Sequence, residues 1–276
     1  MQWVNTFAWG RRSSDVGQPA SAVLRRDLAL EAAIAHEGID VLFQPLINTR
    51  SGAVVGAEAL ARAPIAVSAD ALFARAAAAN LAERLSRLVQ RKALRSAAVW
   101  EGPLKGLSLS INLLPSELSR AGYDQWLLGE ISAVGIDPRR VTVEITESAL
   151  LSDHAAVGEQ LARLRAAGIR IAVDDFGTGY ASLGYLAGLP LDMIKVDKGL
   201  VTEIVSGKRD QIVLRAILKL AADLGLTVVV EGVETNAQLA LLAEWGVDIY
   251  QGFVGSGALT LDQLTRFVAD AQMEAA

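Results

Sequence analysis

The chain has 276 residues, 52% of them hydrophobic, and a formal net charge of −5 at pH 7. This length allows one barrel-type domain or two smaller ones, and the acidic charge argues against a nucleic-acid polymer as partner, because nucleic-acid domains usually carry a basic surface. With no cysteine and two histidines, the chain excludes disulfides, thiolate metal sites and cysteine nucleophiles, so any metal must bind mainly to oxygen, as Mg²⁺, Mn²⁺ and Ca²⁺ do.

The N-terminal residues have the wrong order for a secretory or twin-arginine signal, because their apolar residues precede their arginines. The uncharged stretch Phe176–Leu191 is shorter than the roughly 20 residues that a membrane span needs, and it contains Pro190. We therefore expect no membrane span and a cytoplasmic location. We also expect a flexible leader or linker at residues 1–21 and a single domain at residues 22–276.

From about residue 22 the sequence alternates between helix-like and strand-like segments. Four amphipathic runs end at a glycine before an aliphatic residue, where a left-handed helix cap is needed: Gly135, Gly168, Gly225 and Gly246. Two helix starts have capping-box spacing, at Thr235 with Gln238 and at Thr260 with Gln263. The strands that we predict are Leu42–Asn48, Ala53–Ala59, Leu107–Leu113, Val141–Thr146, Arg170–Phe176, Met193–Asp197, Thr227–Gly232 and Ile249–Phe253.

The predicted strands are continuously apolar in places, as in the runs IAV and TVVV. Strands with this pattern are covered on both faces, which is typical of parallel sheets. Strands of this kind linked by helices predict a (β/α)₈ barrel of the α/β class, and a doubly wound open sheet is the alternative.

Polar side chains stand at or near the ends of seven of these strands. In a barrel, strand ends converge on one mouth, the face where barrel enzymes place their chemistry. For any single residue, an exposed strand end or a structural salt bridge is the alternative interpretation. The residues are Glu58, Asn112, Glu144, Asp174 with Asp175, Asp197 with Lys195 before it, Glu231 and Gln251.

If these groups share one mouth, six carboxylates face a single lysine there, so the excess negative charge requires divalent metals. Two ions about 4 Å apart, bridged by a carboxylate and a water, are the arrangement that hydrolyses phosphate esters. Lys195 would then orient the water or the leaving oxygen. The glycines of the segment Gly177–Tyr180 allow a tight, movable loop beside the pair Asp174 and Asp175.

The tripeptide Glu58-Ala59-Leu60 stands within FQPLINTRSGAVVGAEALAR, and six further segments follow it in order. With these motifs, the chain resembles the EAL-domain cyclic di-GMP phosphodiesterase family over residues from about 22 to 270. The further segments are Ser110–Leu113, Val143–Ser148, Asp174–Tyr180, Leu189–Asp197, Glu231–Thr235 and Gln251–Phe253.

The resemblance implies a barrel with one antiparallel strand and a reaction that hydrolyses one phosphodiester of cyclic di-GMP to linear pGpG. This reaction would lower cyclic di-GMP in bacterial second-messenger signalling. It would require two Mg²⁺ or Mn²⁺ ions per active site and be inhibited by Ca²⁺. The resemblance also implies a homodimer, with a contact near the loop that follows Asp175.

The resemblance also assigns roles to individual residues. Lys195 would hold the attacking water with support from Asp197, and Glu147 would steady the loop after Asp175. Asp174 would bridge the two ions and Asp175 would serve the second. The full set of metal ligands would be Glu58, Asn112, Glu144, Asp174, Asp175 and Glu231, with Glu58 and Glu231 also counted as catalytic. The residues at the nucleotide would be Gln44, Leu60, Arg62 and Gln251.

The sequence departs from the family pattern at the expected ligand-binding rim. Ala63 stands where tryptophan is usual, the segment after Arg62 is shortened and lacks the usual acidic residue in its helix, and Ala258 replaces a proline. These changes affect the expected affinity and selectivity more than catalysis. Two alternatives therefore stand beside the phosphodiesterase: a receptor or protein-interaction module that does not hydrolyse the dinucleotide, and a barrel metal enzyme acting on another phosphodiester.

Overall fold

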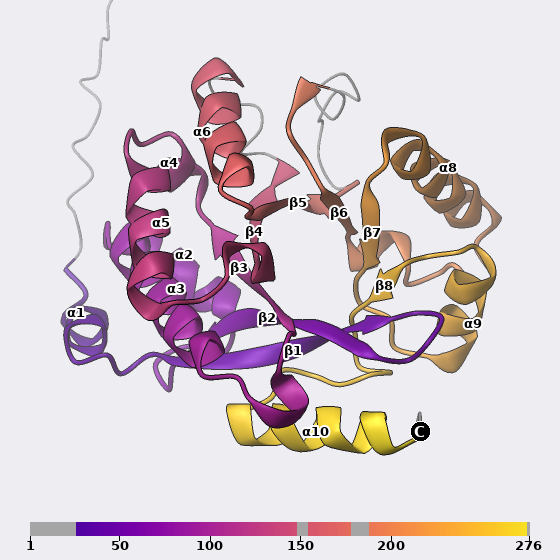
Figure 1. Cartoon of the computed structure of the whole chain (residues 1–276), viewed down its shortest axis with the longest axis horizontal. Coiled ribbons are helices and arrows are strands. Elements are labelled where there is room, and N and C mark those ends of the chain that lie inside the picture. Colours follow the sequence, from indigo (N-terminus) through magenta and orange to yellow (C-terminus); the bar gives the residue numbers. More distant parts are fainter. Residues whose placement is uncertain (1–25, 148–153, 178–187, 275–276) are drawn as a thin grey trace, which may run out of the picture.

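The computed structural model describes residues 26–147, 154–177 and 188–274. Eight strands close into a barrel in chain order (Figure 1). The (β/α)₈ prediction is thus confirmed, and the open-sheet alternative is wrong. The expected leader at residues 1–21 lies outside the described residues. The strands are β1 (Asp40–Asn48), β2 (Val54–Arg62), β3 (Ser108–Leu113), β4 (Val141–Thr146), β5 (Arg170–Phe176), β6 (Met193–Val196), β7 (Thr227–Val230) and β8 (Ile249–Tyr250).

One strand of the barrel runs against the others. β1 is antiparallel to both β2 and β8, whereas β2 through β8 pair in parallel. A short turn suffices between β1 and β2, because antiparallel neighbours need no crossover helix. Asn48 stabilises this turn by accepting hydrogen bonds from the backbone N–H groups of Arg50 and Ser51 at 3.1 and 2.9 Å. The single antiparallel strand agrees with the expectation from the family.

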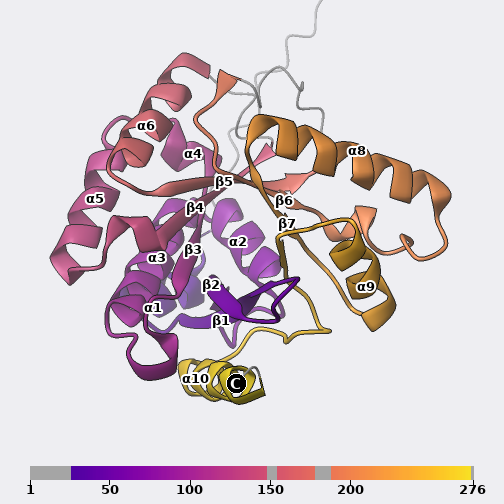
Figure 2. The same cartoon turned by 45° about the vertical axis from the view of Figure 1, so that its right-hand side comes forward.

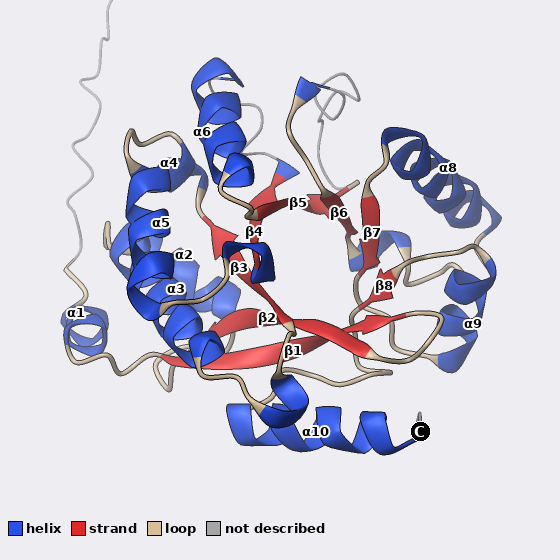
Figure 3. Ribbon diagram, viewed as in Figure 1, coloured by secondary structure: helices blue, strands red, loops and turns tan. Residues whose placement is uncertain are grey.

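Helices surround the barrel (Figures 2 and 3). Their starts and ends follow the sequence signals: all four predicted exit glycines have positive φ, between 71° and 100°, and Thr235 and Gln238 form the expected capping box. No helix within the described ranges is long and apolar enough to cross a membrane. The α-helices are α1 (Leu28–Ala35), α2 (Ala69–Ala78), α3 (Ala82–Ala98), α4 (Pro115–Leu118), α5 (Tyr123–Val134), α6 (His154–Ala166), α8 (Lys208–Leu224), α9 (Asn236–Glu244) and α10 (Leu261–Glu274). The 3₁₀ helices are η1 (Gly102–Leu104), η2 (Pro138–Arg140) and η4 (Lys198–Leu200).

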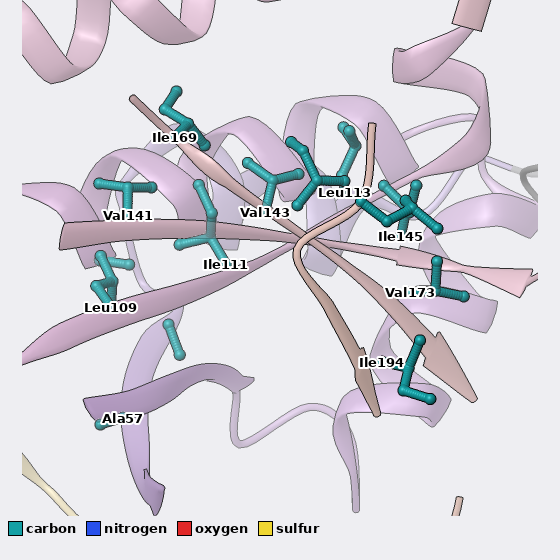
Figure 4. Packing of buried hydrophobic residues seen from close by; sticks show 14 of the residues in the cluster. Ala57, Leu109, Ile111, Leu113, Val141, Val143, Ile145, Ile169, Val173 and Ile194 are labelled. Atoms are coloured by element: carbon teal, nitrogen blue, oxygen red, sulfur yellow. The ribbon is translucent and has the colours of Figure 1, made fainter. Parts of the chain in front are cut away.

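The barrel strands bury apolar side chains on both faces. Their outer faces carry residues such as Leu109, Val143 and Val173 into the main core cluster (Figure 4). A second, small cluster brings together Leu46, Ala172, Met193 and Val229 from four different strands. Because successive side chains of a strand point to opposite faces, this small cluster fills the barrel interior. The two layers together explain the continuous apolar runs.

Several strand boundaries differ from the prediction. β2 extends to Arg62 because β1 pairs with it along its whole length, from Asp40 opposite Arg62 to Ile47 opposite Val54. Glu58 therefore lies in the middle of its strand rather than at the end. β6, β7 and β8 are shorter than predicted, so Asp197, Glu231 and Gln251 follow directly after their strands.

Gly252→Ala should destabilise the fold by about 1–3 kcal/mol, because overpacking a fixed backbone has this cost. A Cβ at Gly252 would lie 2.2 Å from the carbonyl oxygen and 2.3 Å from the nitrogen of Val233. Gly129→Ala in α5 is the matched control, since a Cβ there meets no atom within 4 Å. It should stabilise by about 0.5–1 kcal/mol through helix propensity. Thermal unfolding of both variants checks this, and an unchanged Tm for Gly252→Ala would contradict the close approach.

Candidate functional site

The polar layer of the barrel lies directly above the small interior cluster. Asp174, Lys195 and Glu231 each stand two residues after a member of that cluster, namely Ala172, Met193 and Val229. The period of two therefore turns them to the same inner face. Glu144 enters from β4 with Asn112 as its pairing partner on β3. The strand-end residues converge as expected because they continue one inward-facing row on each strand.

Lys195 is the centre of this layer and is only 1% exposed. Its ammonium Nζ lies 2.7 Å from Glu144 Oε2 and 2.7 Å from Glu231 Oε1. It also lies 3.2 Å from Glu58 Oε2 and 3.2 Å from Asp174 Oδ1. Four carboxylates from four strands thus surround one buried cation.

The charges in this cluster do not balance, and the pKa values reflect this. Burial would lower the pKa of Lys195, but Glu144, Glu231, Glu58 and Asp174 together raise it well above its ordinary value, so the ammonium stays charged. Burial also raises the pKa of Glu231 to about 7 and that of Glu144 well above its usual range. Burial, together with the excess of carboxylates over ammonium, therefore makes full ionisation of the site unfavourable.

Three side chains hold the Glu58 carboxylate in place and favour its ionised form. Burial works against its ionised form, but Lys195 and two amide donors hold its pKa below the ordinary value. Gln251 donates to Glu58 Oε2 at 2.9 Å, and Asn112 donates to Glu58 Oε1 at 2.8 Å. Both carboxylate oxygens are thus fixed in place at the barrel axis.

The adjacent acids Asp174 and Asp175 both reach the mouth because the backbone of β5 is irregular there. Asp175 has φ of 56°, in the left-handed region, and the pairing between β5 and β6 shifts register between Val173 and Phe176. The Asp175 N–H donates to Asp174 Oδ1 at 3.0 Å. Burial and the neighbouring Asp174 raise the pKa of Asp175. A regular strand would have turned the second acid to the opposite face.

Two further predicted residues are bound to the backbone of neighbouring turns. Glu147 Oε2 accepts from the N–H of Gly177 at 3.1 Å, at the start of the loop that it was expected to steady. Residues 178–187 of that loop lie outside the described residues. Asp197 accepts from the N–H of Gly199 at 2.8 Å, which caps η4.

Two cavities of about 280 and 290 Å³ open at this mouth and share Glu58, Leu60 and Asp174. Gln44 and Gln251 line the first, as the resemblance implied. Phe253, 75% exposed, and Lys198 line it as well and were missed by the sequence reasoning. Their one signal was position, because Lys198 directly follows Asp197 and Phe253 ends the segment Gln251–Phe253.

The segment after Arg62, where the sequence departs from the family pattern, lies at or near the second cavity. Asp70 and Phe73 of α2 line this cavity, and neither was predicted. Arg62, which was expected at the nucleotide, lines neither of the two cavities and donates to the carbonyl of Ala61 at 2.8 Å. Ala63 is buried in a core cluster with Leu72.

The donor set at the mouth fits hard divalent cations. It consists of carboxylate and amide oxygens and carries excess negative charge, which is the chemistry that Mg²⁺ and Mn²⁺ prefer. Glu58 and Glu144 are buried at its base, whereas Asn112 and Asp175 are exposed at the mouth. Within the described ranges, no three acidic or histidine side chains are arranged to hold a metal ion. The four central carboxylates are directed at the Lys195 ammonium, so a metal would have to share them with Lys195.

Comparisons with known proteins show the family of this chain. A family model described as EAL domain matches residues 27–257. A cyclic di-GMP phosphodiesterase of Pseudomonas aeruginosa is 33% identical over 261 residues, which cover 93% of this chain and 44% of that protein. The chain spans between 29% and 34% of the length of three further bacterial relatives.

Solved structures of EAL proteins are also similar to this chain. The EAL domain of Mycobacterium smegmatis DcpA is 33% identical and has a TM-score of 0.75, covering 84% of this chain and 98% of that chain. A Klebsiella pneumoniae protein solved as a complex with manganese and cyclic di-GMP is 33% identical and has a TM-score of 0.73, covering 80% of this chain and 56% of that chain. From its fold, its motifs and these matches, the chain belongs to the EAL domain family.

Proposed function

We propose that this protein is a metal-dependent phosphodiesterase that hydrolyses cyclic di-GMP to linear pGpG. The observation that carries this proposal is the buried Lys195 among four carboxylates at the C-terminal mouth of the barrel. The relative from Pseudomonas aeruginosa, which has this activity in its name, supports the substrate. The activity would lower cyclic di-GMP in bacterial signalling.

Glu58, Asn112, Glu144, Asp174, Asp175 and Glu231 would hold two Mg²⁺ or Mn²⁺ ions. When bound, such ions polarise the phosphoryl oxygens and lower the pKa of a coordinated water. The complex of a family member with manganese and cyclic di-GMP supports a divalent ion at this site. We further propose inhibition by Ca²⁺ and a homodimer.

The chain's own residues supply the remaining steps. Lys195 keeps its proton and orients the attacking water, whose oxygen forms a bond to one phosphorus while the bond from that phosphorus to the ribose oxygen breaks. The water gives up one proton as its oxygen bonds to phosphorus, and the leaving ribose oxygen takes up one proton, so that the exchange balances and gives pGpG with one terminal phosphate. Gln251 and Asn112 hold Glu58 in place during this exchange. Gln44, Leu60 and Arg62 would contact the nucleotide.

A second candidate function is a receptor that binds cyclic di-GMP without cleaving it. The observation in its favour is Arg62, which donates to the carbonyl of Ala61 and lines neither cavity at the mouth. Such a receptor would bind the dinucleotide even after chelation of metals. The phosphodiesterase requires a metal for turnover, so chelation separates the two.

Purified protein with Mg²⁺ or Mn²⁺ should cleave cyclic di-GMP much faster than pGpG or an aryl phosphodiester, and EDTA should abolish all three rates. EDTA should abolish turnover because the excess carboxylate charge at the mouth requires cations before an anionic phosphodiester can approach. Initial rates on the three substrates, with and without EDTA, check this. Comparable rates on the aryl phosphodiester would favour a general phosphodiesterase, and EDTA-resistant turnover would contradict the metal requirement.

A further inference from the structure

A buried polar network lies beneath the mouth, between α3 and the end of β3. Gln90 of α3 is 1% exposed, and its Nε2 donates to the backbone carbonyl of Asn112 at 2.9 Å. Asn112 is the residue whose side chain holds Glu58. We propose that Gln90 is a positioning residue that fixes Asn112, and through it Glu58, in the geometry that the site needs.

The strand pairing explains why β3 requires this support. The ladder between β2 and β3 ends at Glu58 opposite Ser110, two residues before Asn112. Beyond that point β3 keeps β4 as its strand neighbour, with Asn112 opposite Glu144. The Asn112 carbonyl therefore takes a side-chain donor from α3, since a buried carbonyl needs a partner. Gln90 thus provides the hydrogen bond that the backbone lacks at the end of β3.

The orientation of the Gln90 amide is itself fixed. The Tyr123 hydroxyl donates to Gln90 Oε1 at 3.1 Å, so the amide nitrogen faces Asn112. Gln90 Nε2 also donates to Ser86 Oγ at 3.0 Å, and Ser86 donates to Glu117 Oε2 at 2.7 Å. All four of these side chains are at most 2% exposed. From Gln90 the network has two branches, one ending on the Asn112 carbonyl and one passing through Ser86 to the Glu117 carboxylate.

Glu117 connects this network to the chain that follows Asn112. Its Oε2 also accepts from the backbone N–H of Leu114 at 3.3 Å. The backbone is thus held at Asn112 by Gln90 and two residues later by Glu117. Because the Asn112 side chain is exposed at the mouth, its position depends on this backbone support more than on packing around it. Displacements of about 1 Å at a catalytic group can cost about 100-fold in rate.

The chain offers a matched control in Gln160 of α6. Gln160 is 4% exposed and donates from Nε2 to the backbone carbonyl of Leu118 at 2.6 Å. The residue type, the burial and the kind of contact are the same as for Gln90. The carbonyl belongs to α4, however, and neither Gln160 nor Leu118 lines a cavity at the mouth, whereas Gln90 and Asn112 both line the second one. A purely structural role would make the two glutamines equivalent.

The test compares Gln90→Leu with Gln160→Leu in the full chain, and it rests on the proposed function only for its kinetic readout. Thermal unfolding should show a similar loss of Tm for both. Only Gln90→Leu should lower kcat, by about tenfold or more as for other groups that orient metal ligands, with little change in KM. Only Gln90→Leu should weaken Mn²⁺ binding measured by calorimetry.

Tyr123→Phe provides a milder variant, because it removes one hydroxyl and leaves the ring in place. It should shift kcat and Mn²⁺ binding in the same direction as Gln90→Leu, but less. Equal kcat and equal Mn²⁺ affinity for Gln90→Leu and Gln160→Leu would overturn the inference. A wild type that binds Mn²⁺ but does not cleave cyclic di-GMP would refute the proposed function alone, and the Mn²⁺ affinities would still decide the role of Gln90.

Discussion

Lys195→Met should abolish hydrolysis of cyclic di-GMP and lower the stability of the metal-free protein by about 3–5 kcal/mol, the usual cost of removing one partner from a buried ion pair. Lys195 is the cation that the carboxylates of Glu58, Glu144, Asp174 and Glu231 share. Without it these carboxylates repel one another in a buried site and take up protons. Thermal unfolding in EDTA and a rate assay measure the two effects.

Divalent metal should restore part of the stability of Lys195→Met, because a cation at the carboxylates replaces the missing charge. It should not restore activity, since the group that orients the water is gone. Lys219→Met is the control: Lys219 is exposed on α8 and pairs with Asp223 at 3.1 Å, a contact of little energetic value. A Lys195→Met protein with wild-type Tm in EDTA would contradict the electrostatic account of the site.

Glu58→Ala should reduce kcat by a factor on the order of 10³ or more, comparable to the loss of a main electrostatic group in other active sites. The substitution removes a proposed metal ligand and leaves the amide donors of Asn112 and Gln251 without their acceptor. Rates under saturating cyclic di-GMP and Mg²⁺ measure the effect.

Glu234→Ala is the matched control for Glu58→Ala. Glu234 lines the same cavity at the mouth but is exposed and follows β7 rather than facing the barrel axis. Its loss should leave kcat within a few-fold of wild type. A Glu58→Ala variant that turns over as fast as Glu234→Ala would mean that Glu58 does not hold the reacting groups.

The barrel could be predicted from the sequence because its signals are local. Glycines such as Gly135 and Gly225 mark helix ends through backbone conformation alone, and the apolar run around Val228 reports burial on both faces. The acids were expected at one mouth because they stand at or near the ends of strands that converge in a barrel. Strand ends were less predictable, because the length of β2 depends on its pairing with β1, a contact between segments rather than a property of either.

The parts of the site that could not be predicted from the sequence depend on tertiary contacts. Gln90 carries no motif and stands within an ordinary amphipathic helix, so its contact with the Asn112 carbonyl appears only when α3 packs on β3. The left-handed backbone at Asp175 is unusual for a residue other than glycine and has no local signal. The contact between the Arg62 guanidinium and the carbonyl of Ala61 likewise has no signal in the motif.

Chromatographic identification of the product from cyclic di-GMP separates a phosphodiesterase from a receptor in one experiment. Wild-type protein and Glu58→Ala are incubated with cyclic di-GMP in Mg²⁺, in Mn²⁺ and in EDTA, and the nucleotides are separated over time. Wild type should give pGpG in either metal, and no pGpG should form in EDTA or with Glu58→Ala. Cyclic di-GMP that stays intact with wild type in both metals, while the protein still binds it, would contradict the account and identify a receptor.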